Sequence, residues 1–104
     1  MTAADIASLA SFYTGIGMRL VVDMGRMAIL ELRGGTHLIL HSGEPGQGSL
    51  DLIVDDIDET SGVLQAMGAS VTPITRGTPH DRFDSADPEG NTLIVQSTHA
   101  IGVV

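Results

Sequence analysis

The chain has 104 residues and no cysteine, and its 13 acidic side chains outnumber its 5 basic ones, for a net charge of −8. A single domain of this length can bury one core, and without cysteine it has neither disulfides nor thiol chemistry. The negative charge argues against nucleic acid and anionic membrane surfaces as partners, because both select basic patches. The N-terminus lacks the features of a signal peptide and no run approaches the ~18–20 apolar residues of a membrane span, so we expect a cytoplasmic protein.

The first half of the chain reads as one helix followed by three strands. Residues 2–17 carry apolar side chains at helical spacing, with Thr2 and Asp5 as capping residues and Gly15 or Gly17 as the stop. Three short apolar runs bounded by glycine then predict strands at 18–25, 27–35 and 36–43. A Gly- and Pro-rich linker follows at 43–48.

The second half reads as a strand, a helix and three more strands. Residues 49–56 predict a strand, and residues 56–69 a helix in which Asp56 and Glu59 have capping-box spacing and Gly68 is the stop. The remaining strands are expected at 70–75, around Arg82–Phe83, and at 91–97.

This order of elements indicates an internal repeat. The segments GTHLILHS (35–42) and GNTLIVQS (90–97) share four residue types in register, 55 positions apart. Each half is then a strand, a helix and three strands, except that the first half lacks its leading strand. The C-terminal tail THAIGVV (98–104) aligns with the leading strand of the second half, His99 with Ser49 and Val103–Val104 with Ile53–Val54.

Three segments resemble the vicinal oxygen chelate superfamily, which includes glyoxalase I, bleomycin-resistance proteins, fosfomycin-resistance transferases and extradiol dioxygenases. They are DIASLASFYTGIGM (5–18), DLIVDDIDE (51–59) and DPEGNTLIVQ (87–96). The resemblance implies an α+β fold of two βαβββ modules in one domain, 1–104. Reading the chain head to tail restores the family order, which suggests a circular permutation: module one is 1–42 plus 98–104, the linker 43–48, and module two 49–97. The alternative is a chain that lost its first strand and acquired an incidental tail.

In such a fold each sheet curves over its helix, and the other faces of the sheets form a cup. Alternation along the strands directs Leu38, Leu40, Leu52, Leu93 and Val95, with Leu50 and Val54, toward the helices. The side chains expected to face the cup and bind a ligand are His37, Ile39, His41, Ser49, Asp51, Ile94, Gln96, His99 and Ile101.

The resemblance implies four metal-ligand positions, which fall here on His99, Ile39, Ser49 and Ile94. Two isoleucines cannot hold a cation, and a serine hydroxyl is a poor replacement for imidazole or carboxylate. We therefore expect no cofactor and no metal at the inherited site. A displaced divalent site remains open as an alternative, should His41, Asp51, Gln96 and His99 converge.

Other polar groups have simpler interpretations. His37 and His41 suit a half-solvated strand face, and His80 a surface loop. Acidic residues 55–59 suit a helix N-terminus, and residues 87–90 a turn with Gly90 at positive φ.

The sequence therefore predicts a metal-free small-molecule binder of the bleomycin-resistance type, acting as a homodimer. A metal-dependent lyase, isomerase or transferase is the enzymatic alternative, and a fragment completed only by its dimer partner is a third possibility. The chain has three aromatic residues, too few to stack a large planar drug, and its charge favours a cationic or neutral ligand.

Overall fold

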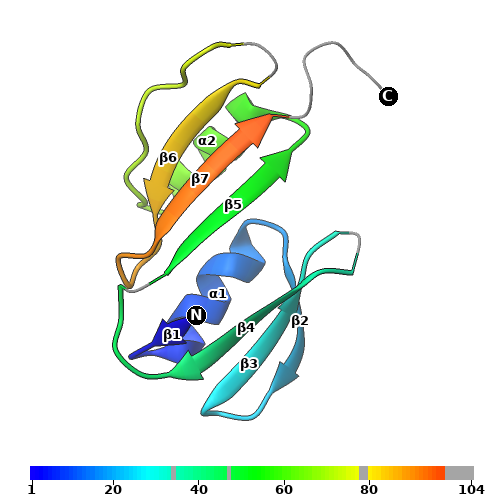
Figure 1. Cartoon of the computed structure of the whole chain (residues 1–104), viewed down its shortest axis with the longest axis vertical. Helices are drawn as coiled ribbons and strands as arrows, with labels where there is room; N and C mark the ends of the chain where they lie inside the picture. The colour runs from blue at the N-terminus through cyan, green and yellow to red at the C-terminus, as the bar shows by residue number, and fades with distance from the viewer. Residues whose placement is uncertain (34, 47, 78–79, 98–104) are drawn as a thin grey trace. The chain divides into compact units, whose positions relative to one another are not determined.

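The computed structural model describes residues 1–33, 35–46, 48–77 and 80–97 (Figure 1). The chain divides into two compact units. Unit 1 comprises Met1–Gly48 together with Asp87–Asn91, and unit 2 comprises Ser49–Ala86 and the segment that begins at Thr92. Each unit holds one sheet and one helix, as the α+β prediction requires. No helix within the described ranges is long and apolar enough to cross a membrane.

Unit 1 has the strand–helix–three-strand order expected of one module. Its sheet has the order β1-β4-β3-β2, in which β1 is parallel to β4 and the other pairs are antiparallel. Helix α1 packs against β2, β3 and β4, and the Asp5 side chain caps it by accepting the Ser8 N–H. The elements are β1 (Thr2–Ala3), α1 (Ile6–Gly15), β2 (Arg19–Asp23), β3 (Met27–Glu31) and β4 (His37–Ser42).

The prediction that the first half lacks a leading strand was wrong. Residues Thr2 and Ala3 form β1, in register with His41 and Ser42 of β4, and do not belong to the helix. The Met1 carbonyl accepts the His41 N–H at 2.9 Å, and the Met1 amino group donates to the Ile39 carbonyl at 3.1 Å. Two residues are too few to show the alternation by which a strand is read from sequence.

The two leading strands occupy equivalent places. Thr2 pairs with His41 as Ile53 pairs with Gln96, and His41 and Gln96 are the repeat-related positions. Thr2 and Ala3 therefore take the places that the alignment gave to Val103 and Val104. Residues 98–104 lie outside the described residues, so the circular permutation stays a prediction.

Unit 2 contains a three-stranded sheet of order β5-β7-β6, with β5 parallel and β6 antiparallel to β7. Segment 70–75, expected as a strand, instead makes two isolated bridges, Val71 to Ser85 and Thr75 to Arg82. Pro73 lies between the two bridges and has no N–H for a continuous ladder. The elements of the unit are β5 (Ser49–Val54), α2 (Ile57–Ala66), β6 (Arg82–Ala86) and β7 (Thr92–Ser97).

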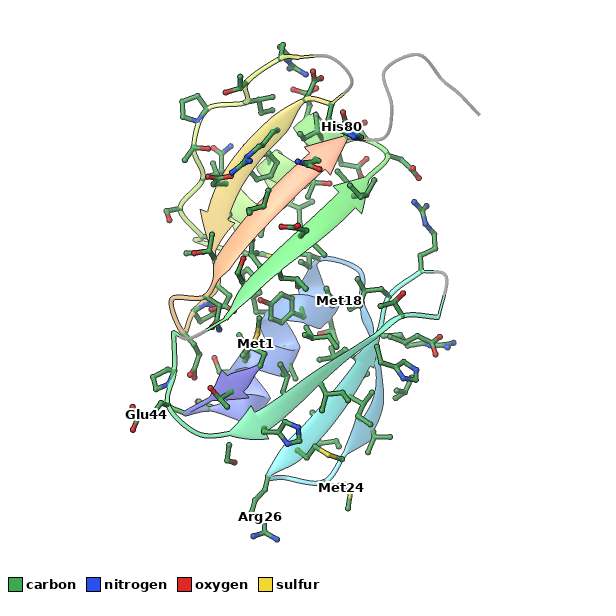
Figure 2. All side chains as sticks on the ribbon, viewed as in Figure 1. Met1, Met18, Met24, Arg26, Glu44 and His80 are labelled. Atoms are coloured by element: carbon green, nitrogen blue, oxygen red, sulfur yellow. The ribbon has the colours of Figure 1, made fainter. Side chains whose placement is uncertain are left out.

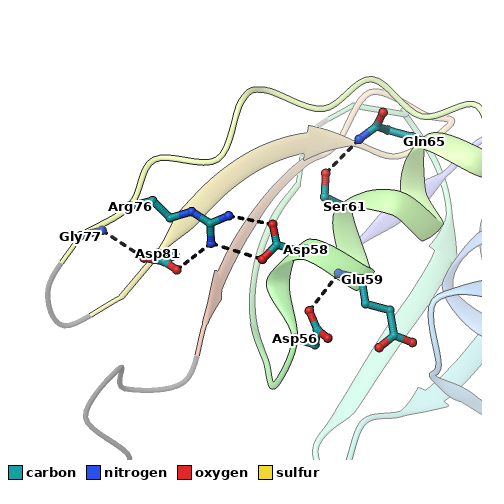
Figure 3. Close-up of polar contacts among 8 residues, drawn as sticks. All are labelled: Asp56, Asp58, Glu59, Ser61, Gln65, Arg76, Gly77 and Asp81. Atoms are coloured by element: carbon teal, nitrogen blue, oxygen red, sulfur yellow. Dashed lines mark hydrogen bonds and ion pairs between the residues drawn. The ribbon is translucent and has the colours of Figure 1, made fainter.

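The acidic start of α2 has a structural role, as the sequence predicts (Figure 3). The Asp56 carboxylate caps the helix by accepting the Glu59 N–H at 3.0 Å. Arg76 bonds both Asp58, at 2.7 Å, and Asp81, at 3.0 Å, and these contacts raise its pKa. The ion pair between Arg76 and Asp58 connects the segment that follows Thr75 to the start of α2.

Each unit buries an aliphatic layer between its helix and its sheet, on the strand faces that alternation predicts. In unit 1 the buried side chains include Leu9, Tyr13, Ala28, Leu30, Leu38 and Leu40. In unit 2 they include Leu52, Ile57, Leu64, Phe83, Leu93 and Val95, while Leu50 and Val54 are half-buried.

The turn 87–91 belongs to unit 1 although it connects β6 to β7. The Asp87 carboxylate is buried and accepts the Tyr13 hydroxyl at 2.7 Å and the Asn91 side-chain amide at 2.8 Å. The Glu89 carboxylate accepts the N–H groups of Ala4 and Asp5, at 2.6 and 2.8 Å. Gly90 has φ of 84°, which confirms the positive φ expected in this turn.

Candidate functional site

The candidate site consists of the sheet faces that the helices do not cover, here called the open faces. The open face of unit 1 carries one polar row, Arg19–Glu31–His37, set by the register of β2, β3 and β4. Arg19 forms an ion pair with Glu31, whose second oxygen lies 3.5 Å from the His37 Nε2. The charges of Arg19 and Glu31 thus compensate each other across two neighbouring strands.

An aliphatic row lies beside this polar row. Val22, Ile29 and Ile39 face one another across β2, β3 and β4, and 41% of Ile39 is exposed. Beyond it, His41 pairs with Met27 on the same face. The open face of unit 1 therefore offers an apolar strip between two polar borders.

The open face of unit 2 is built from the register of β5, β7 and β6. Asp51, Ile94 and Asp84 form one row, and Ile53, Gln96 and Arg82 form the next. Arg82 Nε donates to Asp84 Oδ1 at 3.0 Å, and this hydrogen bond is the main cause that raises the pKa of Arg82. Ile53 is 53% exposed.

The structure places seven of the nine predicted site residues on these faces. His37, Ile39 and His41 are exposed on β4, and Ser49 and Asp51 are exposed on β5, while Ile94 and Gln96 are half-buried on β7. His99 and Ile101 lie outside the described residues. Ligand binding by these residues stays a prediction.

The sequence did not reveal two pairs of interacting polar side chains, one on an open face and one in the core. The first is the Arg82–Asp84 pair, whose orientation follows from the alternation of RFDSA, since Phe83 and Ser85 are buried. The second is the Tyr13–Asp87 hydrogen bond, which joins a helix to a turn 74 positions away and leaves no local pattern. Burial and the Asp87 carboxylate raise the pKa of Tyr13 far above its usual value, which marks a structural hydroxyl.

Three of the four positions that the family resemblance assigns to metal ligands carry side chains that are poor ligands. Ile39 and Ile94 offer no donor atom, and Ser49 offers one neutral hydroxyl. Among the residues that the structure describes, no three His, Asp or Glu side chains gather closely enough to hold an ion. Of the displaced set, Asp51 and Gln96 lie on the open face of unit 2, His41 lies on that of unit 1, and His99 is not described.

Known proteins are similar to this chain in structure, whereas comparisons of sequence found no match. No protein-family model matches the sequence, and a search of curated proteins gives no significant match. Among solved structures, the chain is similar to TnmS3, an antibiotic-binding protein from Streptomyces sp. CB03234, with TM-score 0.80, 23% identity, and coverage of 94% of this chain and 92% of that one.

Two further solved structures have the same architecture. Lactoylglutathione lyase from Agrobacterium tumefaciens gives TM-score 0.80 at 21% identity, covering 99% of this chain and 92% of that one. FosX from Listeria monocytogenes is a fosfomycin-resistance protein whose structure was solved with Mn(II) and sulfate. It gives TM-score 0.82 at 11% identity, with coverage of 96% of this chain and 86% of that one. These similarities agree with the resemblance of residues 5–18, 51–59 and 87–96. The chain therefore has the fold of the vicinal oxygen chelate superfamily.

Proposed function

We propose that this protein binds a small organic molecule on the open faces of its two sheets and does so without a metal ion. The observation that carries the proposal is the chemistry of Ile39, Ser49 and Ile94 at positions where the family's metalloenzymes have ligands. Aliphatic rows with a few polar groups beside them are the usual lining of a small-molecule site. Similarity to the antibiotic-binding protein TnmS3 supports a binding role.

Metal content is the first test. Protein purified without chelators is analysed by inductively coupled plasma mass spectrometry, and we expect less than about a tenth of an equivalent of any transition metal. One equivalent of Zn, Mn, Ni or Fe would overturn the metal-free proposal and favour the enzymatic alternative, a metal-dependent lyase, isomerase or transferase.

Ligand binding is the second test. A chemically diverse small-molecule library is screened by thermal shift, because a ligand that binds only the folded state raises the midpoint of unfolding. We expect hits that lose affinity in an Ile39→Asp or an Ile94→Asp variant. A library without any hit would contradict the proposed function.

We also propose that the protein acts as a homodimer. Both sheets are open within the described part of the chain, with β2 at an edge of one and β5 at an edge of the other, and an exposed sheet edge is commonly covered by a partner. Light scattering coupled to size exclusion should give twice the 10.8 kDa chain mass at micromolar concentration. A monomer mass there would contradict the dimer.

A further inference from the structure

We infer that the open face of unit 2 binds the ammonium end of an aliphatic cation, with Asp51 as its ion-pair partner. This inference rests on the proposed function and names the class of ligand for one part of the site. It concerns a patch of four residues in two adjacent rows of β5 and β7: Asp51, Ile53, Ile94 and Gln96.

The patch alternates polar and aliphatic side chains in both directions. Asp51 is opposite Ile94, and Ile53 is opposite Gln96. Adjacent strands lie about 4.8 Å apart and side chains two residues apart share one face. The carboxylate and the amide therefore occupy one diagonal of a small square, and the two isoleucines occupy the other.

Within the described part of the chain, the polar groups of this patch have no hydrogen-bond partner that would occupy them. Asp51 is exposed and makes no hydrogen bond or ion pair within the described part of the chain, and its one electrostatic partner is the guanidinium of Arg82. The Gln96 side-chain amide likewise has no hydrogen-bond partner among the described residues. A carboxylate and an amide oxygen are both acceptors, which suits an N–H donor that carries positive charge.

The neighbouring Arg82 does not offer an anion site. Its guanidinium is committed to Asp84, through Nε at 3.0 Å and through a second nitrogen at 3.4 Å. The charges of Arg82 and Asp84 cancel, so the described side chains of this face carry one net negative charge, that of Asp51. An anionic ligand would meet Asp51 without a free cation to compensate it.

We expect the apolar part of the ligand to be an alkyl chain and not an aromatic ring. The chain has one tyrosine, two phenylalanines and no tryptophan, and all three aromatic side chains are buried. An exposed Ile53 and a half-buried Ile94 remain to contact an alkyl chain. The patch therefore matches a primary alkylamine in its protonated form.

The test compares three probes of equal chain length: n-pentylammonium, 1-pentanol and pentanoate. Each is titrated into ¹⁵N-labelled full-length protein, and amide shifts are followed by NMR. We expect n-pentylammonium to bind most tightly, to shift the amides of Asp51, Ile53, Ile94 and Gln96, and to weaken as salt is raised. Equal affinity for the three probes, or tightest binding of pentanoate, would overturn the inference.

Variants show whether Asp51 is the ion-pair partner. Asp51→Asn keeps the shape and removes the charge, and should weaken n-pentylammonium by about three- to tenfold while leaving 1-pentanol unchanged. Glu44→Gln is the matched control, because Glu44 is exposed and its carboxylate makes no hydrogen bond or ion pair with any described residue. Equal weakening by both variants would reduce the effect to net charge and overturn the inference.

The failure of this inference differs from failure of the proposed function. If library ligands bind and the alkylammonium does not, the assignment of Asp51 is wrong and the binding role stands. If nothing from either set binds, both are wrong.

Discussion

At the scale of single residues, Tyr13 combines a buried ring with a buried hydrogen bond in unit 1. Its ring is fully buried in α1, and its hydroxyl donates to the buried Asp87 carboxylate at 2.7 Å. Asp87 also accepts the N–H groups of Glu89 and Asn91, at 2.9 and 3.0 Å. A buried carboxylate is stable in a core only when its oxygens are satisfied in this way.

Removing the Tyr13 hydroxyl should therefore cost stability. Tyr13→Phe keeps the ring and leaves one Asp87 oxygen short of a donor, so we expect the free energy of unfolding to fall by about 1–3 kcal/mol. Urea denaturation followed by circular dichroism measures the change. Thr14→Ala is the control, because the Thr14 hydroxyl is exposed and its one hydrogen bond among the described residues goes to the Ser11 carbonyl, one helical turn earlier. Equal losses in the two variants would contradict the role given to Tyr13.

Alkaline pH should act through the same residue. The pKa of Tyr13 is raised in the folded state by burial and by Asp87, whereas in the unfolded chain it has the ordinary value of about 10. Its stabilising contribution is then complete below about pH 10 and is lost as pH rises above that value. Tyr13 is the only tyrosine, so absorbance at 295 nm reports it alone. We expect tyrosinate to appear together with unfolding; ionisation of a still-folded protein near pH 10 would contradict this.

At the scale of elements, both helices and most strands could be predicted, because their capping residues and alternation are local. Asp56, Gly68 and the burial of Leu38 and Leu40 agree with the sequence. Two elements could not be predicted. β1 is held by β4 rather than by any pattern of its own, and segment 70–75 has strand composition but is interrupted by Pro73.

The N-cap of α2 provides a test at this scale. Asp56→Ala removes the acceptor of the Glu59 N–H and should lower the free energy of unfolding by about 1 kcal/mol. Asp58→Ala is the matched control two positions later, where the carboxylate pairs with Arg76 at the surface. We expect a smaller loss there, because exposed ion pairs contribute little. A larger loss from Asp58→Ala, measured by urea denaturation, would show that the ion pairs of Arg76 hold the unit more strongly than the cap.

At the scale of the whole molecule, the internal repeat predicted that the chain has two halves. It did not predict that a turn from the second half, residues 87–91, belongs to the first unit. Strands β4 and β7 correspond residue by residue at a distance of 55 positions, and β1 pairs with β4 at the same positions at which β5 pairs with β7. The sequence gives no sign that turn 87–91 packs with the first half, since its contacts to Ala4, Asp5 and Tyr13 span more than 70 positions. The open-face residues, by contrast, could be predicted by alternation, which is local, and the same alternation places Arg82 and Asp84 on one face of β6.

Because unit 1 includes residues 87–91, we predict that the first half of the chain cannot fold alone. A peptide of residues 1–48 contains every strand and the helix of unit 1 but lacks Asp87, Glu89 and Asn91. The buried Tyr13 hydroxyl would lose its acceptor, the start of α1 would lose the carboxylate that binds two of its N–H groups, and the Gly48 N–H would lose the Asn91 side chain. A unit of this size has little stability in reserve, and each buried group left unsatisfied costs about 1–3 kcal/mol.

We therefore expect the 1–48 peptide to give the narrow amide shift range of an unfolded chain, measured by NMR beside the full-length protein. A second peptide, 1–48 joined to residues 86–92 through a flexible Gly-Ser linker, restores the turn and should recover dispersed amide shifts. The same peptide with Asp87→Asn and Glu89→Gln keeps the length and loses both carboxylates, and it should remain unfolded. If residues 1–48 alone were folded, the turn would be an accessory of unit 1 and not a part of its core.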